Sequence, residues 1–299
     1  MLKYVPFTSV SAPAQVMEKP LSGTQKRDSV ENCRQLRRFL FVAVGLTLCF
    51  SKPLFDLAHF ASHDELYSHI LLVPLVSLYL VWNQRRSIAS DPGPTTSSFW
   101  FNRAWIPLSM GGAILGIYWM AAHAGWPAKP NDYLSYHTLA FVLLLTGVCF
   151  LFLTSHALRI VAFPLAFLMF LVPFPAFARN WIEVFFQNTS ADAAYLMLNM
   201  SGAAVIRHGL EMRVPGISFT VGQECSGIHS SLALLITSLL AGHLLLRSPW
   251  KKAVLVLAVI PLGILRNGFR IFVIAQLCIH IGPEMINSAI HKRGGPIFF

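Results

Sequence analysis

Long apolar runs alternate with short polar segments along most of the chain after residue 38. A hydrocarbon core of about 30 Å is crossed by about 20 helical residues, and several of the runs approach this length. The pattern therefore predicts an all-α polytopic integral membrane protein with about seven to eight membrane helices. The expected spans are residues 39–55, 68–82, 104–124, 136–153, 160–172, 228–246 and 253–265.

Residues 176–200 show a different pattern, in which apolar and polar positions mix at helical spacing. This predicts an amphipathic helix that lies at the outer surface of the membrane. From residue 204 to 221 the period shifts towards two, with Gly209, Pro215 and Gly216 as turn signals. The shift predicts a short outward-facing hairpin, which would serve either as a structural strap or as a substrate-binding edge.

The last apolar run, residues 271–281, is too short to cross the bilayer, since it gives about 16 Å of helix against about 30 Å of hydrocarbon. Gly282 and Pro283 follow this run and would end a helix. We therefore expect a re-entrant or interfacial segment that returns the chain to the outer face. Irregular backbone at that depth is stable only where protein or a water-filled cavity surrounds it.

The composition supports membrane insertion. Of the 299 residues, 55% are hydrophobic and 12% are charged, with a mean hydropathy of +0.58, which excludes a soluble domain. The net charge is +10, but the basic residues form short clusters between apolar runs, which argues against nucleic-acid binding. The clusters at 34–38, 85–86 and 247–252 are expected on the cytoplasmic side. Residues 1–33 are expected to form a disordered cytoplasmic tail, and residues 34–299 the transmembrane domain.

The five cysteines lie at irregular spacings without a paired C-x-x-C, so they indicate neither a disulfide framework nor a metal site, and no cofactor is expected. Buried, inert thiols are expected for Cys33, Cys49, Cys149 and Cys278. Cys225 differs, because it lies in the sequence VGQECSG directly before the span that begins at residue 228. Free backbone N–H groups and the macrodipole at a helix N-terminus favour a thiolate. Cys225 is therefore the candidate nucleophile.

Two further motifs lie downstream of Cys225. They are Arg266-Asn267-Gly268-Phe269-Arg270 and His291-Lys292-Arg293-Gly294-Gly295. With ECSG, these motifs make the chain resemble the exosortase and archaeosortase family of membrane cysteine peptidases or transpeptidases. The resemblance extends upstream, over most of the chain beyond about residue 60, to Tyr67-Ser68-His69, Phe163–Leu168 and Pro173-Phe174-Pro175.

The resemblance implies a catalytic set of Cys225, Arg270 and His291, which match the family motifs C-S-G, N-x-x-R and H-x-x-x-G. The cysteine would attack a backbone carbonyl and form a thioester, the histidine would carry the proton, and the arginine would stabilise developing charge. The substrates would be membrane-anchored exported proteins with a C-terminal sorting tail of PEP-CTERM type, which carries a Pro-Glu-Pro-type motif, one transmembrane helix and a basic cluster.

The resemblance also implies a location and a missing element. The protein would be a multi-pass protein of the bacterial inner membrane, in organisms that secrete exopolysaccharide, with its active site facing the periplasm. Family chains usually carry one more apolar helix after the histidine motif. Because this sequence stops at Phe299, that last helix is expected to be missing.

The residues leave several alternatives open. His229, four residues after Cys225, would share a helix face with it and could act as the base in place of His291. Intramembrane arginine and histidine would also suit a transporter or channel, and an inactive scaffold is a further possibility. No residue decides whether water or an amine would resolve the thioester. Structural roles are expected for His243 and His280, which lie singly on apolar faces.

Overall fold

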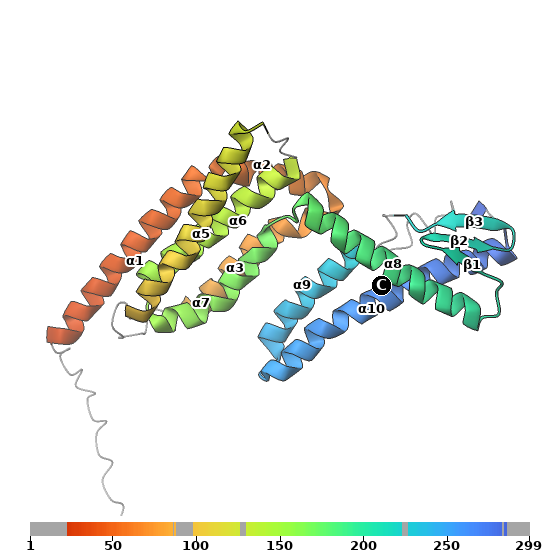
Figure 1. Ribbon diagram of the computed structural model, residues 1–299. Coiled ribbons are helices and arrows are strands. Elements are labelled where there is room, and N and C mark those ends of the chain that lie inside the picture. Colours follow the sequence, from red (N-terminus) through yellow and green to blue (C-terminus); the bar gives the residue numbers. More distant parts are fainter. Residues whose placement is uncertain are drawn as a thin grey trace, which may run out of the picture.

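The computed structural model describes residues 23–85, 87, 98–125, 130–222, 227–282 and 284–285, and these form helices and a small sheet (Figure 1). The helices, in chain order, are α1 (Gly23–Cys49), α2 (Ser51–His63), the 3-10 helix η1 (Glu65–Leu71), α3 (Leu72–Asn83), α5 (Ser98–His123), α6 (Pro130–Phe152), α7 (Ser155–Phe167), the 3-10 helix η2 (Leu168–Leu171), α8 (Ala176–Met200), α9 (Ile228–Leu245) and α10 (Pro249–His280). The strands are β1 (Ile206–His208), β2 (Glu211–Val214) and β3 (Ile217–Thr220).

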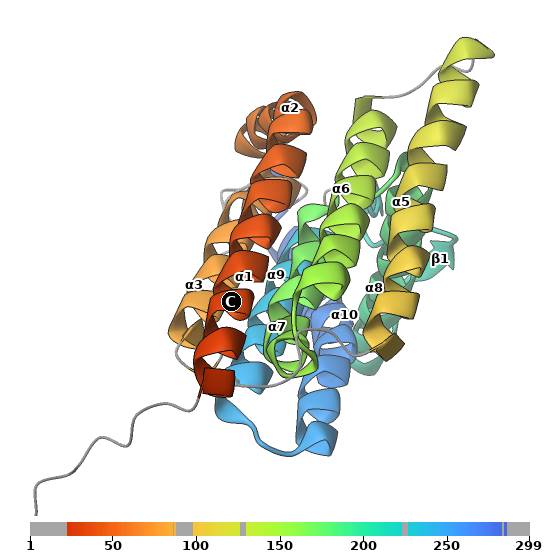
Figure 2. The same cartoon turned by 90° about the vertical axis from the view of Figure 1, so that its left-hand side faces the viewer.

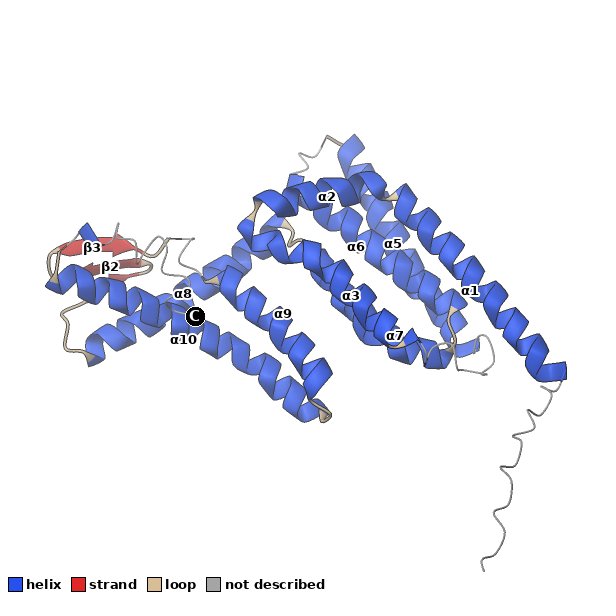
Figure 3. Cartoon of the chain, turned by 180° about the vertical axis from the view of Figure 1, so that it is seen from behind, coloured by secondary structure: helices blue, strands red, loops and turns tan. Residues whose placement is uncertain are grey.

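The helices lie in two groups. In the first group, α6 packs between α1 and α5, with α3 and α7 close by (Figure 2). In the second group, α9 and α10 run antiparallel, and α8 crosses α10 close to the sheet (Figures 1 and 3). The 3-10 helix η1 contacts α9 and so connects the two groups.

The apolar helices confirm the predicted fold class. Among the described residues, five helical segments are long and apolar enough to cross a membrane, and up to seven are if each of two bent helix pairs forms one span. The five are Leu66–Asn83, Arg103–His123, Asn131–Phe152, Ile228–Leu245 and Pro249–His280, and the bent pairs are Arg34–Cys49 with Ser51–His63 and Ser155–Leu171 with Ala176–Met200. The protein is therefore a helical, polytopic membrane protein.

The first helix differs from the predictions at both ends. α1 begins at Gly23, so residues 23–33 are helical and not part of a disordered tail, because Gln, Lys, Arg and Glu in this stretch are good helix formers. The predicted run to residue 55 also breaks, since α1 ends at Cys49 and α2 leaves it at 64°. Pro53 explains the break, because its ring would clash with the carbonyl of Cys49 in a continuous helix. Residues 1–22 lie outside the described part of the chain.

α8 begins after a proline corner that two hydrogen bonds hold in place. Ser135 Oγ donates to the carbonyl of Pro173 (2.8 Å), and the backbone N–H of Ala176 donates to Asp132 Oδ1 (2.9 Å). Pro173 and Pro175 lack the N–H that a continuing helix needs, and α8 leaves the α7–η2 segment at 89°. The helix predicted at 176–200 is confirmed, and it runs nearly perpendicular to the apolar segment before it.

The predicted hairpin is confirmed and extended to three strands. β1, β2 and β3 pair antiparallel in chain order, so that each turn is tight. Gly209 and Gly216 lie in these turns with φ of 61° and 88°, a backbone conformation that glycine adopts without steric cost. Met212 and Val214 bury against residues of α8 and α10. The sheet is therefore part of the packed core of the second group of helices.

α10 contradicts the expectation of a re-entrant segment. It runs without a break over Pro249–His280, about 48 Å at 1.5 Å per residue, and then ends before Gly282. The helix continues through Gly268, which lets α10 approach α8 closely. A Cβ at Gly268 would lie 2.6 Å from the Cβ of Ala193. Residues 271–280 pack against α8 and the sheet, so protein covers the length of α10 that exceeds the bilayer core.

Candidate active site

The candidate site consists of the segment around Cys225 and the part of α10 that carries Arg270. Residues 223–226 and His291 lie outside the described residues, so Arg270 is the predicted catalytic residue whose place the structure gives. The structure describes the chain up to Gly222 on one side of Cys225 and from Gly227 on the other. The contacts of these two ends therefore define the site.

The chain before Cys225 is held by α8. Val221, at the end of β3, is buried, and its N–H donates to the carbonyl of Leu210 (3.0 Å). Its carbonyl accepts a hydrogen bond from Nε2 of Gln187 (2.5 Å), a buried side chain on α8. A buried carbonyl beyond the last strand pair needs such a donor, because an unpaired one would cost about 1–3 kcal/mol. Gln187 thus fixes the point at which the chain leaves the sheet.

The chain after Cys225 is held by α10. Gly227 has a left-handed φ of 70°, and its carbonyl accepts the N–H of Ser231 (3.0 Å), which starts α9. A Cβ on Gly227 would lie 3.0 Å from Cγ of Asn267, whose side chain is only 2% exposed. Gly227 belongs to the C-S-G motif and Asn267 to the N-x-x-R motif. The structure therefore brings two motifs that are far apart in the sequence into direct contact.

A hydrogen-bonded link joins Arg266 to the start of α9. Arg266 Nη2 donates to Oγ of Ser230, and the same hydroxyl donates to the carbonyl of Gly227 (2.9 Å). One turn earlier on α10, Gly263 approaches Ser231, because a Cβ on Gly263 would lie 2.5 Å from Ser231 Oγ. α10 therefore fits closely against the first turn of α9.

Arg270 lies one turn beyond Arg266 along α10, about 6 Å further along the helix axis. Its side chain is half-buried. The positive end of the α9 macrodipole lies beside Asn267, between these two arginines in the sequence. The guanidinium group of Arg266 and the positive end of the macrodipole thus meet at the first turn of α9, and Arg270 follows one turn further along α10. Such a region suits a thiolate, a carboxylate or a developing oxyanion.

α8 presents its polar face to the protein and its apolar face outward. Glu183 and Gln187 are 8% and 6% exposed, whereas Trp181 and Phe177 are both 72% exposed. The sequence pattern correctly predicted an amphipathic helix. It did not show which face points towards the protein, because an apolar face is stable either in lipid or in a protein core. For that reason the role of Gln187 was missed, whereas Asn267 was known only as part of the N-x-x-R motif. A polar position at i and i+4 on an otherwise apolar helix was the signal available for Gln187.

An ion-pair cluster ties α8 to η1 at the same end of the helices. Arg179 pairs with Glu183 (2.8 Å) and with Asp64 (3.8 Å). Asp64 Oδ1 also accepts the N–H of Leu66 and so caps η1. Tyr67, the first residue of the Y-S-H motif, is 1% exposed beside this cluster. The cluster holds η1 in its position against α8.

The alternative base His229 is exposed at the start of α9. His229 lies in the first turn of α9, which begins at Ile228 directly after the left-handed Gly227, and Cys225 lies outside the described residues. His243 stacks on Phe163 with 3.7 Å between ring centroids, in keeping with the structural role expected for it. His280 is exposed in the last turn of α10 and does not lie on an apolar face. At the C-terminal end of a helix, a basic group interacts favourably with the macrodipole.

The other cysteines follow the prediction in part. Cys149 and Cys278 are buried free thiols, as expected. Cys49 is exposed, because it lies in the last turn of α1, where the break before α2 leaves its side chain outside the core. The side chain of Cys33 lies outside the description that the structure gives.

These features define a class: a polytopic helical membrane protein with a polar, positively charged site where two apolar helices and an inverted amphipathic helix meet. The sequence profile of the transmembrane exosortase family (Exosortase_EpsH) matches residues 61–299, and since this is most of the chain, the protein belongs to the transmembrane exosortase family. Membership implies the processing of sorting signals at the membrane. No curated protein and no solved structure gives a match.

Proposed function

We propose that the protein is a membrane cysteine peptidase or transpeptidase in which Cys225 is the nucleophile, His291 the proton carrier and Arg270 the group that stabilises developing charge. The observation that carries the proposal is the contact of Gly227 with Asn267, since it joins the C-S-G motif to the N-x-x-R motif. Two peptide units separate Gly227 from Cys225, which limits the distance between their Cα atoms to about 7 Å. The nucleophile therefore lies within reach of the arginine-bearing face of α10.

The charges around α9 support the choice of nucleophile. A thiolate is stabilised by free N–H groups at a helix N-terminus and by nearby guanidinium groups. The start of α9 supplies the positive end of a helix macrodipole, and Arg266 is bonded to Ser230 in its first turn, with Arg270 one turn further along α10. An oxyanion that develops on the attacked carbonyl would gain from the same groups.

The reaction proceeds through an acylation step and a deacylation step. His291 takes the thiol proton of Cys225, the thiolate sulfur attacks the scissile carbonyl carbon, and a tetrahedral oxyanion forms beside Arg270. As the oxyanion collapses, the carbon–nitrogen bond breaks, His291 gives its proton to the leaving amine, and a thioester remains on the enzyme. Water or a second amine then gives a proton to His291 and attacks the thioester carbonyl. The carbon–sulfur bond breaks, the acyl group leaves as a free acid or as a new amide, and His291 returns the proton to the sulfur of Cys225.

The substrate class follows from family membership and from the position of the site. The site lies at the end of the helices away from the Arg247–Lys252 turn, which carries three basic residues. Because basic turns remain in the cytoplasm, the site faces outward, where exported proteins present their C-terminal sorting tails. The substrates are therefore membrane-anchored exported proteins that are cut next to the tail.

Co-expression with a candidate tailed protein from the same organism tests the proposal. Wild type should convert the tailed precursor into a shorter product, Cys225→Ala should leave it intact, and Cys49→Ala should process it normally because Cys49 lies in α1, away from the site. Mass spectrometry of the product's C-terminus distinguishes hydrolysis from transfer. Cleavage by Cys225→Ala at the wild-type rate would refute the assignment of the nucleophile.

A further inference from the structure

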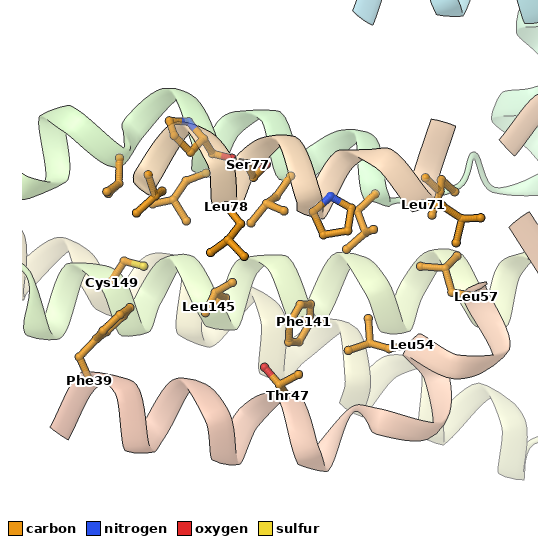
Figure 4. Close-up of a pocket in the computed structure, with 18 of the residues that line it drawn as sticks. Phe39, Thr47, Leu54, Leu57, Leu71, Ser77, Leu78, Phe141, Leu145 and Cys149 are labelled. Carbon is orange, nitrogen blue, oxygen red and sulfur yellow. Dashed lines mark hydrogen bonds between the residues drawn. The ribbon is translucent and has the colours of Figure 1, made fainter. Parts of the chain in front are cut away.

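An apolar groove runs between the helices of the first group, away from the candidate active site. It has a volume of about 620 Å³ and is lined by side chains from α1, α2, η1, α3, α6, α7 and η2. Figure 4 shows Phe39 and Thr47 of α1 facing Ser77 and Leu78 of α3 across this space, with Phe141 and Leu145 of α6 between them. From Phe141 to Leu153 the lining residues of α6 cover about 18 Å of helix.

The two hydroxyl groups in the lining of the groove have their donors satisfied within the protein, so they offer a ligand no O–H donor. Thr47 Oγ1 donates to the carbonyl of Ala43 (2.9 Å), and Ser77 Oγ donates to the carbonyl of Pro164 (3.3 Å). The remaining lining residues are apolar or, like Cys149, only weakly polar. An occupant of the interior is therefore a hydrocarbon chain.

The size of the groove limits the shape of the occupant. A helix with its side chains is about 10–12 Å across, so it needs a wide and open channel. A single acyl chain is much thinner, and one leaflet of the hydrocarbon core is about 15 Å deep, close to the length of the groove. The groove therefore fits one acyl chain from one leaflet better than it fits a peptide helix.

Positive charge gathers at one end of the groove. Arg37 and Arg38 follow the lining residue Leu36 on α1, and Arg159 precedes the lining residue Val161 on α7. Arg85 lies just beyond the end of α3, four residues after the lining residue Val81, with its guanidinium group over the ring of Trp82. All four side chains are exposed. The carboxylates that the structure describes on α2, η1's cap and α6, namely Asp56, Asp64 and Asp132, lie at the opposite end of these helices.

We propose that this groove binds one acyl chain of an anionic phospholipid, whose phosphate lies among these arginines. The apolar, hydrogen-bond-satisfied interior takes the chain, and the guanidinium groups form charge-assisted hydrogen bonds with the phosphate. The lipid belongs to the leaflet on the basic side of the membrane. It fills the space between α1, α3 and α6 and so stabilises the packing of the first group of helices. The proposal does not depend on the peptidase assignment.

The test uses the full chain purified in a maltoside detergent, with added phosphatidylglycerol or phosphatidylcholine of identical acyl chains, and native mass spectrometry to count retained lipid. Wild type should retain one phosphatidylglycerol and at least ten-fold less phosphatidylcholine. The triple variant R37Q/R38Q/R85Q should lose this preference. The matched triple R247Q/K251Q/K252Q, at the α9–α10 turn, should keep it. Equal retention of both lipids by wild type, or equal losses in the two triple variants, would overturn the proposal.

Binding of the acyl chain is tested by a matched pair of substitutions on α3. Leu78 lines the groove, whereas Leu75 is 64% exposed and does not line it. Leu78→Trp should reduce lipid retention several-fold, and Leu75→Trp should not. A second experiment uses only wild type, so its result does not depend on whether a variant folds. Wild type is photolabelled with a phosphatidylglycerol that carries a diazirine on its acyl chain. Adducts should concentrate on groove residues such as Phe39 and Leu145, and adducts equally frequent at Ile117 of α5 would contradict the proposed site.

Discussion

A side-chain carbon added to Gly227 would lie 3.0 Å from Cγ of Asn267 and 3.2 Å from its Cβ. Backbone and side chain are thus in contact where the segment that follows Cys225 meets α10. Since Asn267 is buried and Gly227 has a left-handed φ, neither residue can shift without moving the start of α9. The relative position of Gly227 and Asn267 is therefore fixed by packing between the start of α9 and α10.

Gly227→Ala should impair the site more than the fold. The left-handed backbone costs a non-glycine residue about 1–2 kcal/mol, and the new methyl group must also displace Asn267. We expect processing of a tailed substrate to fall at least ten-fold, with a loss of a few degrees in Tm. Gly112→Ala, in α5, is the matched control, because a Cβ there meets open space and alanine favours a helix. Unchanged processing by Gly227→Ala would show that the contact is dispensable.

Gln187→Leu should destabilise the chain before Cys225. The substitution removes the donor to the Val221 carbonyl and leaves that buried group unpaired, at a cost of about 1–3 kcal/mol. Asn188→Leu is the control, since Asn188 bonds only within its own helix, to the carbonyl of Val184. Thermal unfolding in detergent and the rate of substrate processing measure the effect. If the two variants unfolded at the same temperature, the bond between Gln187 and Val221 would contribute nothing to stability.

Some elements were predictable because the signals that define them are local. The start of α9 at Ile228 was expected from the apolar run that begins there, and the structure places it there. The turns at Gly209 and Gly216 were likewise indicated by residue type. Hydrophobic periodicity also found α8, but it could not tell which face points inward. In a membrane, lipid takes the place of a core, so Gln187 and Glu183 face the protein while Trp181 faces outward.

The length of α10 could not be predicted in the same way. Arg266 and Arg270 looked like the end of a span, because charged residues are costly in lipid. In the structure, Arg266 bonds to Ser230 of α9, and the helix continues alongside α8 through Gly268. These are contacts between segments far apart in the sequence. Composition and periodicity indicate whether a segment is helical and whether lipid or water surrounds it, but they do not identify the distant residues that it contacts.

Orientation can be measured with single cysteines. Basic clusters alternate with poorly basic segments, so the turn at Ser248 should be cytoplasmic and the sheet should be outside. In a background with the native cysteines replaced by alanine, Ser218→Cys, which is exposed on β3, should react with an impermeant maleimide added to intact cells. Ser248→Cys should react only after the cells are permeabilised. Reaction of Ser248→Cys in intact cells would reverse the proposed topology.

Arg270→Lys separates two roles for the arginine. The substitution keeps the positive charge and loses the planar fork of donors. We expect a loss of at least ten-fold in the single-turnover rate, because an oxyanion gains more from fixed, directed donors than from a flexible point charge. Arg213→Lys, in the sheet, is the control, since Arg213 is exposed and pairs with Glu211. A near-normal rate for Arg270→Lys would mean that Arg270 supplies positive potential alone.

Substitutions should separate the role of Cys225 as the nucleophile from that of His291 as the base. Cys225→Ser should lose nearly all activity, because an alcohol is far less ionised than a thiol and a helix end cannot close that gap. His291→Ala should also be severe, but its residual rate should rise with pH as the thiol ionises unaided. His229→Ala should retain activity, because His229 lies in the first turn of α9, beyond the left-handed turn that separates it from Cys225.

A pH series on these three variants distinguishes the base from a residue that only supports the fold. A structural loss at His291 would lower the rate by the same factor at every pH, whereas loss of a proton acceptor is relieved when hydroxide or ionisation of the thiol replaces it. The reverse result, with His229→Ala inactive and His291→Ala silent, would move the base to α9.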